Sequence, residues 1–457
     1  MTFVVRSLVA CAIAVMMCQP LHADIAGIIN SYYAVTAIGA AGCVSYADVR
    51  SSTGLSPNDR VLVIQMNGAE ARRTEDASYG VVTDMGGAGL WEIATVASVT
   101  PTRVVLRERL RNQYNTLAAV QLVRIHTGTN ERVHAPVLAQ PWNGSTGGVI
   151  AIELTGTLTL DNEVNASSCG FRGGIKRSGG SPCSAMLLAA PATNNLAAQK
   201  GESHATPGPN DHSGRGAFAT AGGGGVSHNS GGGGGANAGA GGQGGNEYAG
   251  CTTTANNGGL GGWAVADALL PPRLLMGGGG GAGHQNNTAA TDGGAGGGIV
   301  VVLAAEITGT SALRADGTSI SALAGNDAAG GAGAGGTVWV SAPSMTGQWD
   351  ITIRGGTGGS VRTGVPHGTG GGGGGGWAVS TARPFPTGVV SIARAGGAPG
   401  ENVLAAGALR QYRATAGRDG IVLQAAAVPF ALVPDPPVVL AAGDTTVCPG
   451  DSVRLSA

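Results

Sequence analysis

The sequence has little charge and few aromatic residues. Only 12% of its residues are charged and 4% are aromatic, and the formal net charge is -1. It contains no basic run, so the electrostatic footprint of a nucleic-acid-binding protein is missing. Disordered chains are typically polar and highly charged, whereas 42% of these residues are hydrophobic. These shortages exclude a nucleic-acid partner and favour a folded chain with a thin core of small apolar side chains.

Long hydrophobic runs are missing too, because no stretch reaches the roughly 18 apolar residues of a membrane-spanning helix. The run from Leu8 to Met17 follows Arg6 and precedes a small residue, Ala23. This order is typical of a signal peptide, and we predict that residues 1–23 are removed. A lipoprotein signal at Cys18 is the alternative. We therefore expect a secreted or cell-surface protein without a membrane span.

Cysteine is scarce, with seven in the sequence. Export makes disulfides permissible among those that remain in the mature chain. Cys448 lies in a module that the sequence truncates, so we expect its partner to be missing. Cys43, Cys169, Cys183 and Cys251 allow three pairings, of which a short staple from Cys169 to Cys183 is one. Neither a Cys-x-x-Cys motif nor a nearby histidine pair occurs, so no zinc site is predicted.

Residues 24–143 have an ordinary composition and the pattern of a small β domain. Short apolar or alternating runs are separated by turn signals: Arg60 to Met66, Trp91 to Val96, Arg103 to Leu106 and Val120 to Ile125. Runs of this length and spacing predict a small antiparallel barrel or sandwich.

Glycine is the residue that the sequence has in excess, with 84 of 457 residues. Beyond residue 143 an apolar run that begins with glycine recurs, at Gly148, Gly298, Gly336 and Gly376. Each of the last three is followed by a Thr-Gly pair and a second short strand. A repeat of roughly 40 residues predicts a stacked solenoid. We expect residues 144–427 to form a right-handed parallel β-helix with the Thr-Gly pairs at its corners.

Runs of consecutive glycines interrupt this solenoid, above all in a long insertion over residues 201–298. They are either flexible excursions, because glycine loses the most entropy on ordering, or packed polyproline-II strands that pair through their backbones. The sequence leaves both interpretations open. Residues 428–437 then read as a proline-rich linker, and residues 438–457 as the start of a truncated β-sandwich module.

Several segments resemble a known group of proteins. Residues 59–68, 139–149, 170–174 and 448–453 are similar to segments of large secreted proteins of Bacteroidetes and related phyla. The resemblance implies that this chain is the N-terminal fragment of a longer protein with immunoglobulin-like or PKD-like repeats. It also implies type IX secretion and a role in cell-surface or matrix attachment. It carries no catalytic residue onto this sequence.

No enzyme site is predicted: we expect no catalytic residue, no cofactor and no metal ion. Polysaccharide-cleaving β-helices need paired carboxylates on adjacent rungs, and the acids near the rungs share no register: Asp316, Asp327 and Asp350. A histidine and acid cluster in the long insertion is interpreted as solvated loop residues, at His204, His212, His228, Glu202 and Asp211. The glycine runs match no phosphate-binding loop.

The positive signal is a set of aromatic and amide residues beside the glycine runs. The candidate ligand contacts, expected to be exposed, are Tyr248, Trp263, Asn256 and Asn257, because aromatics on loops of a rigid scaffold often bind partners. Trp339 and Trp377 are expected in the core instead. We predict a non-catalytic extracellular structural or adhesive module that binds glycan, matrix or neighbouring surface proteins. A glycan-active β-helix enzyme and a self-assembling matrix protein are the alternatives.

Overall fold

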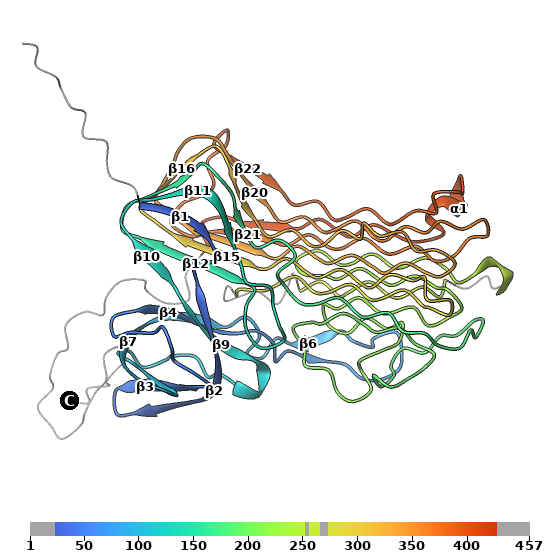
Figure 1. Cartoon of the computed structure of the whole chain (residues 1–457), viewed down its shortest axis with the longest axis horizontal. Coiled ribbons are helices and arrows are strands. Elements are labelled where there is room, and N and C mark those ends of the chain that lie inside the picture. The colour runs from blue at the N-terminus through green and yellow to red at the C-terminus, as the bar shows by residue number, and fades with distance from the viewer. Residues whose placement is uncertain (1–22, 252–255, 266–272, 427–457) are drawn as a thin grey trace, which may run out of the picture.

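The computed structural model describes residues 23–251, 256–265 and 273–426. The predicted signal peptide lies outside the described residues except for Ala23, and the predicted linker and sandwich module lie wholly outside them. The described part is nearly all β-structure. It consists of a barrel, two parallel sheets and a long bundle of glycine-rich segments (Figure 1).

Six antiparallel strands close the barrel in the order β2-β3-β8-β7-β4-β9. Their bounds are Ser31–Ala41 (β2), Val44–Val49 (β3), Arg60–Gln65 (β4), Trp91–Thr100 (β7), Arg103–Leu106 (β8) and Val120–Arg124 (β9). All four apolar runs of the sequence become barrel strands, which confirms the antiparallel barrel. The hairpin β5–β6 (Glu70–Ala71 and Val82–Asp84) and the 3-10 helix η1 (Thr116–Ala118) complete this part.

The inner sheet consists of six parallel strands. These are β10 (His126–Gly128), β12 (Val149–Leu154), β15 (Ile299–Leu303), β18 (Thr337–Ser341), β21 (Trp377–Ser380) and β23 (Ile421–Leu423). The predicted repeat is confirmed residue by residue, because Val149, Ile299, Thr337 and Trp377 are successive partners across this sheet. Strands buried on both faces read as continuous apolar runs, and all five residues of β15 are buried.

The outer sheet covers one face of the inner sheet. Its nine strands are β1 (Ala23–Gly27), β11 (Glu131–Leu138), β13 (Thr157–Leu160), β14 (Val164–Asn165), β16 (Glu306–Gly309), β17 (Ala312–Arg314), β19 (Ser344–Met345), β20 (Trp349–Thr352) and β22 (Val390–Ala393). The Thr-Gly pairs form its bends, because Gly309, Gly347 and Gly388 all have positive φ, a region that favours glycine. The parallel sheets include β1, β10 and β11, which lie before residue 144.

Apolar side chains fill both faces of the inner sheet. One face packs on the outer sheet through residues such as Ile150 and Leu158. The other packs on the barrel, where the rings of Trp91 and Trp339 meet edge to face at 5.1 Å. Trp339 and Trp377 are 0% and 3% exposed, which confirms that they belong to the core.

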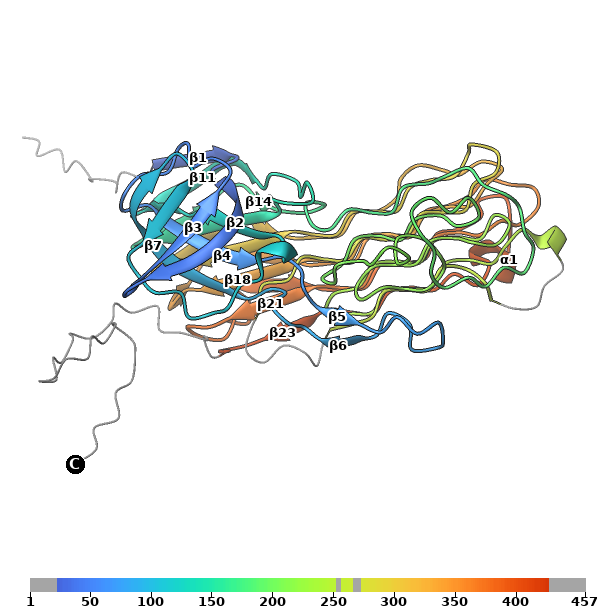
Figure 2. The same ribbon diagram turned by 90° about the horizontal axis from the view of Figure 1, so that it is seen from below.

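The glycine bundle is the set of segments that leave the outer sheet and return to the inner sheet, namely the described parts of 166–298 together with 315–336, 353–376 and 394–420. It extends away from the barrel as a stack of nearly parallel and antiparallel segments (Figure 1; Figure 2). The short helix α1 (Ala408–Gln411) lies at its far end, which we call the tip, and η2 (Ala249–Cys251) is the other helical turn there. The long insertion and the excursions of the later rungs thus form one body.

Backbone hydrogen bonds hold this bundle together with a period of three residues. The N–H groups of Gly231 and Gly234 donate to the segment 242–245, and those of Gly232 and Gly235 to the segment 329–332. Those of Gly233 and Ala236 donate to the segment 220–223. Three residues per turn is the period of the polyproline-II helix. The carbonyls of the same segment accept from three further segments, 259–262, 278–281 and 371–374. Segment 231–236 therefore bonds to six neighbours, where a β-strand bonds to two.

Candidate functional site

The turns of the glycine bundle meet at the tip and surround a hollow of about 640 Å³. We call it the tip hollow. Its polar lining comes from turns far apart in the sequence: His228, Asn229, Tyr248, Asn286, Asn287, Asn326, Arg362, Thr363 and His367. Asparagine and glycine suit such turns because asparagine tolerates the left-handed region, and Asn229 has a φ of 54°. The sequence thus brings polar side chains from several turns together at the end of the bundle.

Three aromatic rings form one side of the tip hollow. The Tyr248 ring stacks on His367 with a centroid distance of 5.2 Å and an interplanar angle of 21°. On its other side His228 lies 5.0 Å away, tilted by 51°. Burial lowers the pKa of His367, so its ring is neutral near pH 7 and acts as an aromatic and hydrogen-bonding group.

Asparagine side chains form another side, and a buried carboxylate holds their turn in place. Asn286 donates to Ser181 Oγ at 2.7 Å and lies 3.0 Å from Nε2 of His228. Asp327 is fully buried. Its carboxylate accepts from the backbone N–H groups of Asn286 and Ala289 at 2.8 and 2.7 Å. Such charge-assisted bonds are stronger than neutral ones, so the amides are fixed on a rigid turn.

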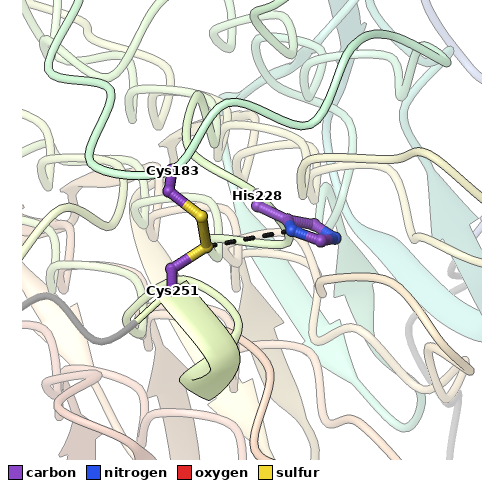
Figure 3. A group of neighbouring side chains, drawn as sticks. All are labelled: Cys183, His228 and Cys251. Atoms are coloured by element: carbon purple, nitrogen blue, oxygen red, sulfur yellow. Dashed lines mark hydrogen bonds between the residues drawn. A yellow bond between two sulfur atoms is a disulfide. The ribbon is translucent and has the colours of Figure 1, made fainter.

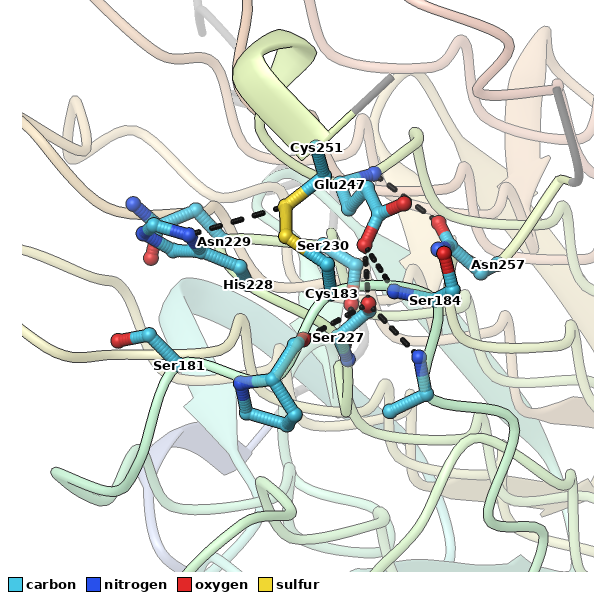
Figure 4. Close-up of a disulfide and its surroundings, with 12 residues drawn as sticks. Ser181, Cys183, Ser184, Ser227, His228, Asn229, Ser230, Glu247, Cys251 and Asn257 are labelled. Atoms are coloured by element: carbon cyan, nitrogen blue, oxygen red, sulfur yellow. Dashed lines mark hydrogen bonds between the residues drawn. A yellow bond between two sulfur atoms is a disulfide. The ribbon is translucent and has the colours of Figure 1, made fainter. Parts of the chain in front are cut away.

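A disulfide ties two of the tip turns together. Cys183 and Cys251 are bonded across 68 residues of sequence, and Nδ1 of His228 lies 3.8 Å from the Cys251 sulfur (Figure 3). Beside it, the buried Glu247 accepts from the backbone N–H of Ser184 at 2.8 Å and contacts Ser227 Oγ (Figure 4). These contacts join segments 181–184, 227–230 and 247–251.

The two sulfurs and His228 Nδ1 lie within 4.8 Å of one another, close enough to hold a metal ion. A cysteine binds zinc as its thiolate, and both sulfurs here are consumed by the disulfide. In its oxidised form the cluster therefore offers a metal only the imidazole of His228.

Of the three pairings that the sequence leaves open, the short staple from Cys169 to Cys183 does not form. Cys183 pairs with Cys251, while Cys169 is a free thiol that lies 3.6 Å from the carbonyl of Ala139. Burial raises the pKa of the Cys169 thiol to about 11, so it is unreactive at neutral pH. Cys43 is also disulfide-bonded. Two cysteines that are close in the sequence suggest a local disulfide. Here the fold instead brings together two turns that are distant in the sequence.

The structure separates the four candidate ligand contacts. Tyr248 lines the tip hollow, whereas Trp263 lines a second hollow of about 510 Å³ on the flank of the bundle, beside Arg418. The Trp263 indole donates to the carbonyl of Tyr79 at 3.1 Å. The carbonyl of Asn256 accepts from Arg215 at 2.9 Å. Asn257 was expected to be exposed and is fully buried, because its amide oxygen accepts from the backbone of Glu247.

Sequence reasoning missed other tip residues, including Asn286, Arg362 and His367. Their only signal was their position in turns between glycine runs, and nothing in the sequence indicates which turns meet. It also misplaced His204 and Asp211 as solvated loop residues. Both are buried, and Nδ1 of His204 lies 2.9 Å from Thr220 Oγ1.

A groove between barrel and bundle, of about 440 Å³, holds aromatic residues and carboxylates together. Burial alone would raise the pKa of Asp211, but hydrogen bonds from Tyr79, Arg73 and the Gly208 N–H lower it below its usual range. Glu202 accepts from Arg172 at 2.9 Å. A glycosidase needs one carboxylic acid with a raised pKa. Both carboxylates of this groove instead hold arginine side chains.

Comparisons with known proteins give distant likenesses. No family model and no curated protein matches the chain. Three solved structures are similar to it. The first is the Gp54 tailspike of Acinetobacter baumannii bacteriophage AP22, in complex with A. baumannii capsular saccharide (9% identity over 80% of this chain, TM-score 0.17). The second is the tailspike gp61 of Pseudomonas phage phi297 (11% identity over 83% of this chain, TM-score 0.16). The third is the tailspike gp49 of Pseudomonas phage LKA1 (10% identity over 82% of this chain, TM-score 0.16).

The aligned regions span 56%, 58% and 60% of those three structures. TM-scores this low leave both fold and function to be argued from the chain's own residues. Among the described residues, no helix has the length and apolar character needed to cross a bilayer.

Proposed function

We propose that this chain is a non-catalytic extracellular adhesive module, in which the glycine bundle is a stiff support and the tip hollow is the contact site. The observation that carries the proposal is the convergence of the bundle turns. Segments that include His228, Tyr248, Asn286 and Arg362 meet at one place, which lies at the end farthest from the barrel. Residues on loops held by a rigid scaffold are the usual place for binding.

We infer that the bundle segments are polyproline-II helices and that the sheets wind as a right-handed β-helix. The three-residue hydrogen-bond period supports the first inference, and the rule that parallel crossovers are right-handed supports the second. Ordering a residue costs about 1–2 kcal/mol of backbone entropy, and more for glycine. A bundle can offset this cost only if nearly every N–H and carbonyl finds a partner. The result is a stiff support for the tip.

We propose that the ligand of this module is a glycan. The tip hollow has a volume within the range of roughly 300–1,000 Å³ that small-molecule sites occupy. Its lining of amide, hydroxyl and aromatic groups matches the hydroxyls and the apolar faces of sugar rings. The described residues that line the hollow include no aspartate or glutamate. Hydrolysis by paired carboxylates has no groups to use there.

We propose that the chain is exported to the cell surface, as its resemblance to secreted Bacteroidetes proteins implies. The disulfide between Cys183 and Cys251 supports this location, because disulfides persist in oxidising environments outside the cytoplasm.

A glycan array tests the adhesive function. We expect the mature chain to bind a defined set of glycans and Tyr248→Ala to lose that binding. Tyr46→Ala is the matched control, because Tyr46 lies on the barrel beneath Arg103 and away from the tip. Equal binding by all three proteins would exclude the tip hollow as the contact site. Release of new reducing ends from a bound polysaccharide would instead support the enzyme.

A further inference from the structure

Arg362 is the one arginine, lysine or acidic residue in the described lining of the tip hollow. Arg362 lines the hollow and is exposed. Within the described residues, no carboxylate forms an ion pair with its guanidinium. The acids nearby are already engaged: Asp327 by backbone N–H groups, Glu247 by Ser184 and Ser227, and Glu401 by Arg410 at 2.6 Å. Arg362 is therefore available to an anion from outside the protein.

The backbone holds Arg362 in place at the edge of the hollow. Its N–H donates to the carbonyl of Ala324 at 2.9 Å. Its neighbour Val361 is fully buried and bridges Ala324 on one side and Asn402 on the other. Asn402 is buried too, and its side chain donates to the carbonyl of Thr363 at 3.1 Å. The backbone that carries the guanidinium is thus fixed before binding, so less conformational entropy is lost when Arg362 binds a ligand.

Two polar atoms in the lining are buried without a hydrogen-bond partner among the described residues. They are Oδ1 of Asn286 and Nδ1 of His367, and the His367 side chain is 3% exposed. A buried polar atom without a partner costs free energy. Neither atom has accessible surface, so a ligand hydroxyl in the hollow reaches it only when the Asn286 or His367 side chain rotates.

We propose that the tip hollow binds an acidic saccharide, whose carboxylate pairs with Arg362 and whose hydroxyls bond to the asparagine and histidine groups around it. This proposal rests on the adhesive function above and names the ligand class of the same site. The planar guanidinium matches a carboxylate with two parallel hydrogen bonds. A neutral saccharide would leave that charge unused.

Binding of the mature chain to polygalacturonate, with dextran as the neutral polymer, tests the proposal by biolayer interferometry. We expect polygalacturonate to bind more tightly than dextran and its affinity to fall as salt rises. Arg362→Gln should weaken polygalacturonate binding about 10- to 100-fold, the worth of a hydrogen bond to a charged group. Arg410→Gln is the matched control and should bind like wild type, because Arg410 is a tip arginine already paired with Glu401.

Three results would overturn the proposal. One is unchanged polygalacturonate binding by Arg362→Gln, and another is equal binding of dextran and polygalacturonate. The third is a preference of the wild type for dextran sulfate over polygalacturonate, which would assign the site to sulfate. If a neutral glycan binds and Tyr248→Ala abolishes it, the acidic ligand is wrong but the adhesive function stands. If no glycan binds at all, both fail.

Discussion

Carbonyl oxygens of neighbouring segments occupy the space where side chains would stand along the glycine bundle. At Gly234 a Cβ atom would lie far inside van der Waals contact with the carbonyl of Gly372, and at Gly233 with that of Leu260. The bundle also contains alanines, such as Ala236 and Ala332, which are fully buried. At Gly233 and Gly234 the lack of a side chain is thus a requirement of the packing.

Gly234→Ala should lower the free energy of unfolding by about 1–3 kcal/mol or more, as overpacking of a rigid interior does. Chemical denaturation measures the change. Gly364→Ala is the matched control, because a Cβ atom there meets nothing within 4 Å, and it should unfold like wild type. Equal midpoints for both variants would contradict the close packing.

His284 gives the tip a dependence on pH. It is 2% exposed, its Nδ1 accepts from the backbone N–H of Asn229 at 3.1 Å, and its Nε2 donates to the carbonyl of Gly180. Burial lowers its pKa from 6.5 to about 4. The unfolded chain therefore binds a proton between these pH values that the folded chain refuses, and stability falls as pH drops through this window.

Replacing His284 should reduce the difference in the free energy of unfolding between neutral and acidic pH by at most about 3 kcal/mol. Urea unfolding at pH 7.5 and pH 4.5 measures it, with wild type, His284→Gln and His212→Gln side by side. His212 is exposed, so its variant should keep the wild-type slope. A wild-type slope in His284→Gln would show that other groups cause it.

At the scale of elements, the disulfide is the covalent link between turns that would otherwise depend on hydrogen bonds alone. Replacing Cys183 and Cys251 together by serine should cost about 2–4 kcal/mol, the usual effect of a disulfide that closes a long loop. Hydrogen exchange should become faster in segments 227–230 and 246–251, and glycan affinity should fall. Cys169→Ser should change none of these, since Cys169 is free.

The rungs could be predicted from the sequence and the bundle could not, for a physical reason. The run Ile299 to Leu303 marks a doubly buried strand because its side chains report their surroundings. A glycine run has no side chains to indicate its neighbours, so the partner of Gly232 in the segment 329–332 follows only from the fold. The tip hollow is built from such partners. Tyr248 was predicted from its aromatic side chain, whereas nothing in the sequence indicated that Arg362 lies beside it.

In the whole molecule, every later rung passes through the bundle before it returns to the inner sheet. Trp377 illustrates the connection, since it begins β21, packs in the core and donates from its indole to Asn237 of the bundle at 3.2 Å. Sheets and bundle therefore share residues at their boundary. We expect the described part to unfold in one cooperative step.

Denaturation followed by two probes tests this expectation. Tryptophan fluorescence reports the core around Trp339, and hydrogen exchange by mass spectrometry reports the glycine runs. We expect coincident midpoints, and slow native exchange over 231–236 that is comparable to that of β15 and β18. Fast exchange in the runs with protected rungs would mean that the bundle is a flexible excursion, and the inference of ordered polyproline-II helices would fail.

The three-residue hydrogen-bond period has a consequence for temperature. The bundle removes peptide groups from water and very few apolar side chains. Exposure of apolar surface raises the heat capacity of unfolding, and exposure of polar surface lowers it. The bundle should therefore add little to the heat capacity of unfolding for its length. Apolar interactions weaken on cooling, and the bundle depends little on them. We therefore expect an arm built from backbone contacts to keep its stiffness in the cold, where an arm held by an apolar core would soften.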